Sequence, residues 1–131
     1  MTRLLFDTTF LIDSERAGAE LDQLIDDDDE VAVAAVTIAE LRVGALLADK
    51  RRKSARTAYV NDIVAIIPIV NYDLETAEAH ARLLVAVRQQ GRPRGAHDLI
   101  IAATALASDR TVITADATAF ADLPGVIVRR H

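Results

Sequence analysis

Short apolar runs alternate with longer segments of helical spacing along the whole chain. The runs have the length and composition of strands and lie at 3–7, 31–35, 66–70, 111–114 and 126–129. Helices are predicted at 10–16, 18–27, 37–48, 51–65, 73–90 and 98–108, with a short helical turn at 117–122. Strands that alternate with helices are typical of an α/β fold with a mainly parallel central sheet flanked by helices. No repeat, low-complexity tract or linker interrupts the pattern, so we expect residues 1–131 to form a single domain.

Three residues sharpen these boundaries. Asp73 is a good N-cap for the helix at 73–90, and Gly91 is the residue type that commonly ends a helix. Pro68 cannot donate a backbone hydrogen bond, so we expect the strand at 66–70 either at an edge of the sheet or with an irregular start.

Four carboxylates stand where a predicted strand ends or a predicted helix begins. Asp7 and Asp116 follow apolar runs, Asp98 opens an apolar helix, and Glu40 lies near the start of the helix at 37–48. Because the carboxyl ends of parallel strands share one edge of a sheet, these side chains are expected to converge there. Converging carboxylates repel one another, and a hard cation such as Mg²⁺ would hold them together.

Helix capping offers a simpler interpretation of each carboxylate alone. An Asp at a helix start is usually an N-cap, worth about 1 kcal/mol, and Thr37 with Glu40 has the spacing of a capping box. The joint placement of all four favours a site instead. Apolar neighbours surround Glu40 and Asp98, and several helix starts direct partial positive charge to the same edge.

Composition and charge narrow the classes of function. The chain has no cysteine, which excludes disulfides and thiol chemistry and suits the cytoplasm, where we expect the protein to act. No apolar stretch approaches the ~20 residues of a membrane span, and the N-terminus has no secretory pattern, so we expect no membrane partner. The net charge is −5, but without the acidic run at 26–30 and the four carboxylates, 15 basic residues face 11 acidic ones. The remaining surface therefore suits a nucleic acid if cations neutralise the acidic cluster.

The four carboxylates lie in blocks that together resemble the motifs of PIN-domain proteins, and most closely the VapC toxins of VapBC toxin–antitoxin modules. The blocks, in the order and spacing of that family, are Asp7 to Asp13, Thr37 to Gly44, His97 to Ala105 and Thr114 to Phe120. The resemblance covers nearly the whole chain. It implies an endoribonuclease that depends on Mg²⁺ or Mn²⁺ and uses Asp7, Glu40, Asp98 and Asp116 as its metal and catalytic residues.

The resemblance also assigns roles to neighbouring residues. Thr8 and Thr114 match hydroxyl positions that support such a site. Many relatives carry a further acid where this chain has Ala119, which leaves the number of metal ions open. We expect an RNA phosphodiester to be hydrolysed by a metal-activated water, with no protein side chain as nucleophile.

Partners follow from the same resemblance. It implies a homodimer and a cognate VapB-type antitoxin, assembled with the toxin into a higher-order complex. Such antitoxins often place an Arg near the acidic residues, and the apolar faces of 37–48 and 51–65 are candidates for the groove that receives them.

Several basic groups and one histidine are candidates for substrate contacts. Arg92 and Arg94 precede Asp98 in a predicted loop, and His97 adjoins it, so these three are expected to contact substrate or, for His97, to position the helix. The basic patch from Lys50 to Arg56 is expected to contact RNA, an acidic partner or solvent alone.

Two other classes compete with the nuclease. One is a catalytically silent PIN-like module that binds RNA or protein, although retention of all four acids argues against it. The other is a phosphoryl-accepting receiver domain, whose pattern includes a Lys after its last strands. This chain has no Lys beyond Lys53, so that alternative is weak.

Overall fold

Five parallel strands form one sheet, in the order β3-β2-β1-β4-β5. The computed structural model describes residues 2–131. The strands are β1 (Thr2–Phe6), β2 (Asp29–Ala34), β3 (Ile69–Val70), β4 (Thr111–Thr114) and β5 (Val128–Arg130). The helices are α1 (Thr8–Arg16), α2 (Ala35–Leu47), α3 (Lys50–Ile66), α4 (Leu74–Gln90) and α5 (Ala96–Ala107), with 3₁₀ turns η1 (Leu21–Leu24) and η2 (Ala117–Phe120).

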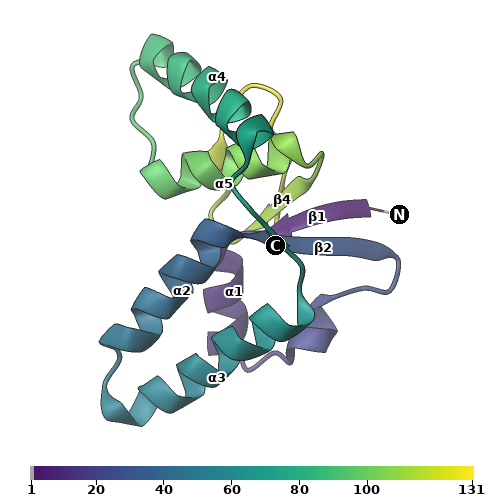
Figure 1. Cartoon of the computed structure of the whole chain (residues 1–131), viewed down its shortest axis with the longest axis vertical. Helices are drawn as coiled ribbons and strands as arrows, with labels where there is room; N and C mark the ends of the chain where they lie inside the picture. The colour runs from purple at the N-terminus through teal and green to yellow at the C-terminus, as the bar shows by residue number, and fades with distance from the viewer. Residues whose placement is uncertain (1) are drawn as a thin grey trace.

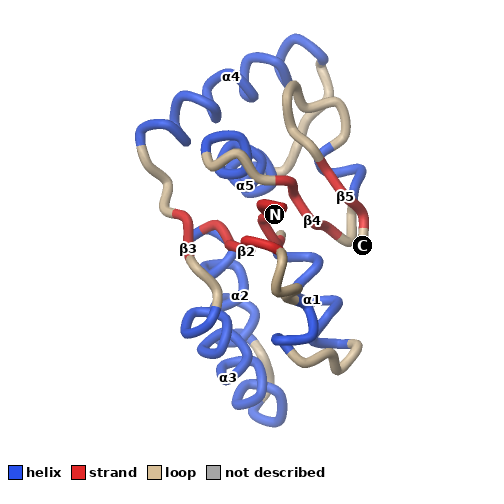
Figure 2. The backbone as a smooth tube through the Cα atoms, turned by 90° about the vertical axis from the view of Figure 1, so that its right-hand side faces the viewer, coloured by secondary structure: helices blue, strands red, loops and turns tan. Residues whose placement is uncertain are grey.

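The helices cover the two faces of the sheet in separate layers. Helices α4 and α5 lie on one face and α1, α2 and α3 on the other (Figure 1, Figure 2). Leu5, on β1, packs in the core beneath α4 and α5. Phe6, the next residue, packs in the core beneath α1, α2 and α3, as the alternation of side chains along a strand requires. The predicted α/β class with a parallel, helix-flanked sheet is therefore confirmed.

The order of the strands reverses direction at β1. The chain runs from β1 outward to β2 and β3, then crosses to β4 on the other side of β1. In open α/β sheets, ligands bind outside the carboxyl ends of the strands at such a reversal point. The carboxyl ends of β1 and β4 are followed directly by Asp7 and by the segment that carries Asp116.

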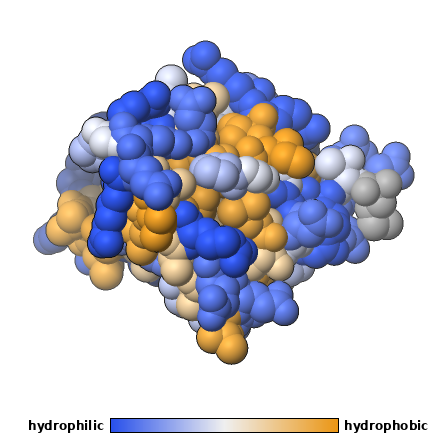
Figure 3. Space-filling view, turned by 90° about the horizontal axis from the view of Figure 1, so that it is seen from above, coloured by the Kyte–Doolittle hydropathy of each residue, from blue (hydrophilic) through white to orange (hydrophobic). Residues whose placement is uncertain are grey.

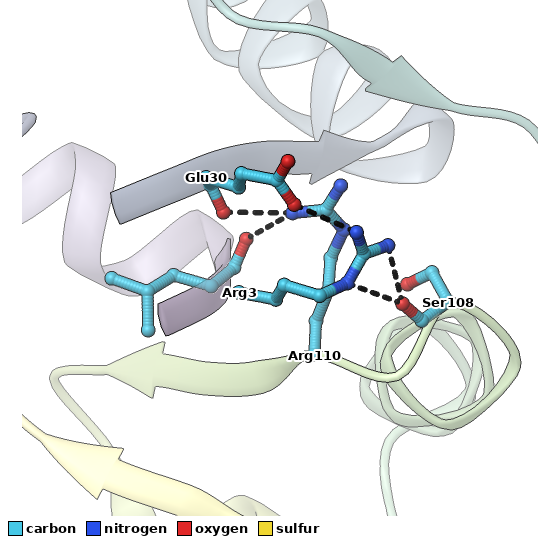
Figure 4. Close-up of polar contacts among 5 residues, drawn as sticks. Arg3, Glu30, Ser108 and Arg110 are labelled. Carbon is cyan, nitrogen blue, oxygen red and sulfur yellow. Dashed lines mark hydrogen bonds and ion pairs between the residues drawn. The ribbon is translucent and has the colours of Figure 1, made fainter. Parts of the chain in front are cut away.

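The opposite edge of the sheet is fixed by an arginine cluster. Arg110 Nη1 donates to the carbonyls of Leu4 (3.2 Å) and Glu30 (2.8 Å). Arg3 Nη1 lies 2.7 Å from Glu30 Oε2, and Arg3 Nη2 donates to the Ser108 carbonyl at 2.9 Å. These contacts, drawn as dashed lines in Figure 4, tie the amino ends of β1, β2 and β4 to the end of α5. They hold the frame of the sheet at the end opposite to the four carboxylates.

Exposed apolar side chains occur on both helical layers. Figure 3 looks onto the α4 end of the molecule and shows apolar patches between strongly polar ones. The large apolar side chains that are exposed include Leu74 and Val85 of α4 and, on the other layer, Leu46 and Leu47 of α2. Within residues 2–131, no helix is both long and apolar enough to cross a lipid bilayer.

Two predicted elements were wrong. The segment 18–27 forms only the η1 turn, in which Leu21 is the one buried residue, so little apolar surface rewards a longer helix. The predicted strand at 66–70 is only two residues long, because Ile66 completes α3 and Ile67 caps it. Its position at the edge of the sheet, one of the two alternatives expected from Pro68, is confirmed.

Candidate metal centre

Asp7 is both a helix cap and a member of the acidic cluster. Its backbone amide donates to the Ile113 carbonyl at 3.0 Å, which fixes the end of β1 beside β4. The carboxylate is 2% exposed and accepts from the Phe10 amide (2.8 Å), the Thr9 hydroxyl (2.9 Å) and the Thr114 hydroxyl (2.5 Å). Burial raises the pKa of Asp7, while these three hydrogen bonds oppose the rise. The predicted cap is real, yet it leaves the carboxylate at the edge of the sheet where the other acids gather.

Glu40 reaches the same place from one turn inside α2. The helix begins after Ala34, so Glu40 is not in its first turn and Thr37 is not its N-cap; the capping-box interpretation was wrong. The Thr8 hydroxyl donates to Glu40 Oε1 at 2.8 Å, and His97 Nδ1 lies 3.5 Å from Glu40 Oε2. Glu40 is thus held between the first residue of α1 and the first turn of α5.

Asp98 is the least constrained of the four carboxylates. It is the third residue of α5, whose N-cap is Gly95, so the interpretation of Asp98 as an N-cap was wrong. Within residues 2–131 its carboxylate accepts no hydrogen bond. Burial raises the pKa of Asp98, and the nearby charges of Glu40, Asp7 and Asp116 raise it further, in that order. The fold therefore leaves this carboxylate half-buried, beside three others, without a donor.

Asp116 is joined to Asp7 through Thr114. The Asp116 amide donates to Thr114 Oγ1 at 2.9 Å, and that hydroxyl in turn donates to Asp7. Asp116 precedes η2 at the N-cap position but makes no capping bond; Oδ1 accepts from the Thr118 hydroxyl at 2.6 Å instead. Residue 119 of this turn is an alanine that packs against the core, and it supplies no second acid beside Asp116.

The donor set suits a hydrated hard cation. As placed, no three His, Asp or Glu side chains within residues 2–131 surround a single point closely enough to ligate one ion directly. Mg²⁺ usually keeps several waters and uses only one or two protein carboxylates, so a cluster of this openness still fits it. The donors are carboxylate and hydroxyl oxygens with no thiolate, which favours Mg²⁺ or Mn²⁺ over zinc.

The residues predicted to contact substrate lie in two different settings. His97 is exposed and adjoins Glu40, inside the acidic cluster. Arg92 lies 3.1 Å from Asp122 Oδ2, and Arg94 donates to the Ala121 carbonyl at 2.5 Å. Both guanidinium groups thus hold the segment after η2, and their contact with substrate stays a prediction.

Two residues of the site were not predicted from the sequence. Thr9 donates to Asp7, lies 3.2 Å from the Thr114 hydroxyl and accepts from the Ala115 amide. Gly95 leaves room for Asp98, because a Cβ built on Gly95 would lie 2.8 Å from Asp98 Oδ2. Thr8 and Thr9 are two hydroxyl residues directly after Asp7, so the sequence could have indicated a role for Thr9. Nothing in the sequence indicated the role of Gly95 except its place before a helix.

A groove leads from Glu40 along the helical layer below the sheet. It has a volume of about 230 Å³ and is lined by α1, α2 and α3, including Glu15, Gly44, Arg56 and Tyr59. The depression includes residues of the faces of 37–48 and 51–65, and its use by an antitoxin stays a prediction.

Comparisons with known proteins identify the family of the chain. A family model for the PIN domain matches residues 4–126. Ribonuclease VapC5 of Mycobacterium tuberculosis is 36% identical over 112 residues, which cover 86% of this chain and 82% of that protein. Toxin FitB of Neisseria gonorrhoeae is 34% identical over 113 residues, which cover 82% of this chain and 78% of that protein.

Solved structures share the fold over nearly the whole chain. The structure of VapBC-5, a VapBC-family toxin–antitoxin system from Mycobacterium tuberculosis, matches with a TM-score of 0.78 at 32% identity, covering 99% of this chain and 98% of that one. VapBC2 from Rickettsia felis, bound to a DNA fragment from its promoter, matches with a TM-score of 0.89, covering 99% of both chains. At 19% identity, the second match shows the fold alone.

Proposed function

The chain belongs to the PIN-domain family as a VapC-type ribonuclease toxin of a type II toxin–antitoxin system, and on that premise we propose how its site works. Asp7, Glu40, Asp98 and Asp116 hold Mg²⁺ or Mn²⁺, and the protein hydrolyses phosphodiester bonds of RNA. The receiver-domain alternative is wrong, because the family is that of PIN domains. The relatives named as ribonucleases argue against the catalytically silent alternative as well.

The observation that carries the proposal is the state of Asp98. No hydrogen bond to its carboxylate is found within residues 2–131, and burial and three other acids raise its pKa against the smaller, opposing effect of His97. A half-buried carboxylate in that position costs free energy unless a positive charge compensates it. A divalent cation supplies that charge, which explains why the fold keeps an arrangement that destabilises the metal-free protein.

The residues around the cluster orient the ligands and leave them available. Thr9 and Thr114 fix Asp7, and Thr8 fixes Glu40, so these carboxylates need little reorganisation when a cation binds. When bound, the cation neutralises phosphate charge and makes water a stronger nucleophile. The hydroxyls of Thr8, Thr9 and Thr114 are all engaged with carboxylates, so the attacking group is water and not a threonine. Ala119 supplies no further carboxylate beside Asp116, so a second cation there would have fewer protein ligands than the first.

Substrate contacts extend from the acidic cluster. His97 is exposed beside Glu40 and is placed to contact a phosphate or ribose of the bound strand. Arg92 and Arg94 are proposed to contribute mainly by holding the segment after η2, with a phosphate contact as their second role. We also propose the cytoplasm as the place of action, since RNA is found there.

The proposed protein partners are an antitoxin and a second copy of the chain. Several similar proteins with solved structures are toxin–antitoxin complexes, among them a FitAB complex bound to a DNA fragment and one from Klebsiella pneumoniae. The groove between α1, α2 and α3 opens toward Glu40, so an antitoxin segment lying there would place a basic side chain at the acids. The apolar patches of the α4 end (Figure 3) are candidates for the homodimer interface.

Cleavage of RNA by purified protein tests the proposal. We expect cleavage with Mg²⁺ or Mn²⁺, none with EDTA, and a loss on the order of a hundredfold or more in Asp7→Asn. Mapping the 5′ ends of RNA cut after controlled expression would identify the target. If wild type still cuts RNA in EDTA and Asp7→Asn cuts it as well, the carboxylates are not the site of cleavage.

A further inference from the structure

The first two turns of α3 carry an unpaired cluster of positive charge. It consists of Lys50, Arg51, Arg52, Lys53 and Arg56, and the first four are exposed. No ion pair within residues 2–131 includes any of the five. Arg56 donates to the Gly44 carbonyl at 3.3 Å, and that contact directs it between α2 and α3. We call these five residues the α3 cluster.

The position of the α3 cluster is unfavourable for the helix itself. The amino end of a helix carries partial positive charge, so acidic residues stabilise its first turn and basic residues destabilise it. The first turn of α3 has no acidic residue, and Asp49 at the N-cap is its only nearby compensation, through the Arg52 amide. Lys50, Arg51, Arg52 and Lys53 thus lower the stability of their own helix and form no ion pair within residues 2–131, which points to an external anion.

Two neighbouring depressions that share residues lie between the acidic site and the α3 cluster. The groove that begins at Glu40 includes Glu15 and Arg56 in its walls. A neighbouring depression of about 370 Å³ shares those two residues and adds Arg51, Arg52 and Ala55. Gly44 is four positions after Glu40, and Arg52 is four positions before Arg56, so at a rise of about 1.5 Å per residue the path spans about 12 Å along the two helices. Only a few nucleotides of an extended strand are needed to cover that distance.

We propose that Arg51 and Arg52 bind backbone phosphates of the RNA strand a few nucleotides from the cut, with Arg56 lining the path between. This inference rests on the proposed function, because it requires the scissile phosphate at Glu40. Guanidinium groups suit phosphates because they donate two parallel hydrogen bonds. The protein carries a net charge of −5, so an anionic strand needs such local cations to stay bound.

RNA fits the path better than an acidic peptide does. Glu40 and Glu15 line the groove together with Arg16, and Glu15 also lines the depression beside Arg51 and Arg52. These two carboxylates repel an acidic segment unless a cation neutralises them. The RNA strand must contact the cation proposed at the four carboxylates in order to be cut, so its charge is compensated there. An acidic peptide need not contact that cation. The strand therefore gains from both ends of the groove, the cation at one and the arginines at the other.

The test measures RNA binding separately from cleavage. Asp7→Asn serves as the inactive background, with Mg²⁺ in excess to neutralise the acids near Glu40, a fluorescein-labelled single-stranded RNA of mixed sequence as the probe and anisotropy as the signal. Arg51→Gln/Arg52→Gln is added to one sample and Arg82→Gln/Arg88→Gln to another. Arg82 and Arg88 are exposed on α4 at the opposite end of the molecule, so the control removes the same charge (Figure 1).

The α3 variant should weaken binding about tenfold or more at low salt. Two lost phosphate contacts should reduce the slope of log K against log salt by about 1.4, because each contact to a single strand contributes about 0.7. The control should change both quantities much less, and both variants should melt like the background, since Arg51 and Arg52 are exposed. Equal effects of the two variants, or an unchanged slope, would overturn the proposal. Loss of antitoxin-peptide binding with RNA binding intact would overturn it as well.

Cleavage by the same arginine variants separates this inference from the function on which it rests. In the otherwise wild-type protein with Mg²⁺, Arg51→Gln/Arg52→Gln should raise KM for a long RNA and leave kcat nearly unchanged. A wild type that does not cut RNA refutes the proposed function whatever the binding data show. A wild type that cuts RNA, with a KM unaffected by the α3 variant, refutes the binding path alone.

Discussion

Replacement of Thr114 by Val tests the hydrogen-bond network that holds the carboxylates. Thr114 is fully buried, and its hydroxyl donates to Asp7 and accepts from the Asp116 amide. Val has nearly the same shape but no hydroxyl. The change therefore leaves a buried carboxylate short of one donor and a backbone amide without its acceptor.

The magnitude follows from the two lost contacts. A hydrogen bond to a charged group contributes about 1.5–3 kcal/mol and a neutral one about 1 kcal/mol. Asp7 keeps the Phe10 amide and the Thr9 hydroxyl as donors, so we expect Thr114→Val to lower the free energy of unfolding by about 2–4 kcal/mol at neutral pH. The affinity for Mn²⁺ should fall too, because Asp7 and Asp116 lose their common support.

Urea unfolding in EDTA measures the loss, with two variants as controls. Thr114→Ser keeps the hydroxyl and loses a methyl group, which costs about 1 kcal/mol. Thr111→Val makes the same chemical change at the first residue of β4, which is only half-buried, and should stay within about 0.5 kcal/mol of wild type. If Thr114→Val is no less stable than Thr114→Ser, the hydroxyl does not hold Asp7 as described.

The pH dependence of Thr114→Val gives a second check. The Thr114 hydrogen bond lowers the pKa of Asp7 against the larger effect of burial, so it favours the ionised form. Its contribution is present where Asp7 is ionised and is lost as the pH falls through the pKa of Asp7. The difference between wild type and Thr114→Val should therefore be largest near neutral pH and smaller in acid.

Three further perturbations have distinct expected results. Asp98→Asn should raise the melting temperature of the metal-free protein at neutral pH, because burial and three acids raise the pKa of Asp98. The gain in melting temperature should shrink as the pH falls toward 3.8, the ordinary pKa of an Asp carboxyl, and thermal melts at several pH values measure it. Gly95→Ala should reduce Mn²⁺ affinity in calorimetric titration, since its Cβ would meet Asp98 Oδ2, whereas Gly44→Ala, with nothing within 4 Å, should not. Leu83 lies on the buried face of α4, and Leu83→Ala should lower the free energy of unfolding in urea by about 2–5 kcal/mol without altering the Mn²⁺ affinity of the folded protein.

Local signals predicted the elements whose ends are set locally. Helix α4 begins after Asp73, whose carboxylate accepts from the Thr76 amide, and ends at Gly91 with a positive φ of 66°. Both boundaries depend on contacts within a few residues, so the sequence alone was sufficient. The segment 18–27 failed for the opposite reason, because whether it forms a helix depends on apolar surface that other elements supply.

The convergence of the carboxylates was predictable, but their support was not. Parallel strands bring Asp7 and Asp116 to one edge whatever the side chains do in detail. The contact between Thr9 and Thr114 joins residues 105 positions apart, and no local pattern indicates it. The start of α5 at Ala96 also required the structure, since Asp98 at the third position looked like a cap in the sequence.

A titration of Mn²⁺, followed by its electron paramagnetic resonance signal, tests the central claim most directly. We expect wild type to bind Mn²⁺ in competition with Mg²⁺, and the variants Asp7→Asn, Glu40→Gln, Asp98→Asn and Asp116→Asn each to bind it at least tenfold more weakly while remaining folded. Wild type that binds Mn²⁺ no more tightly than the variant carrying all four substitutions would show that these carboxylates do not form a metal centre.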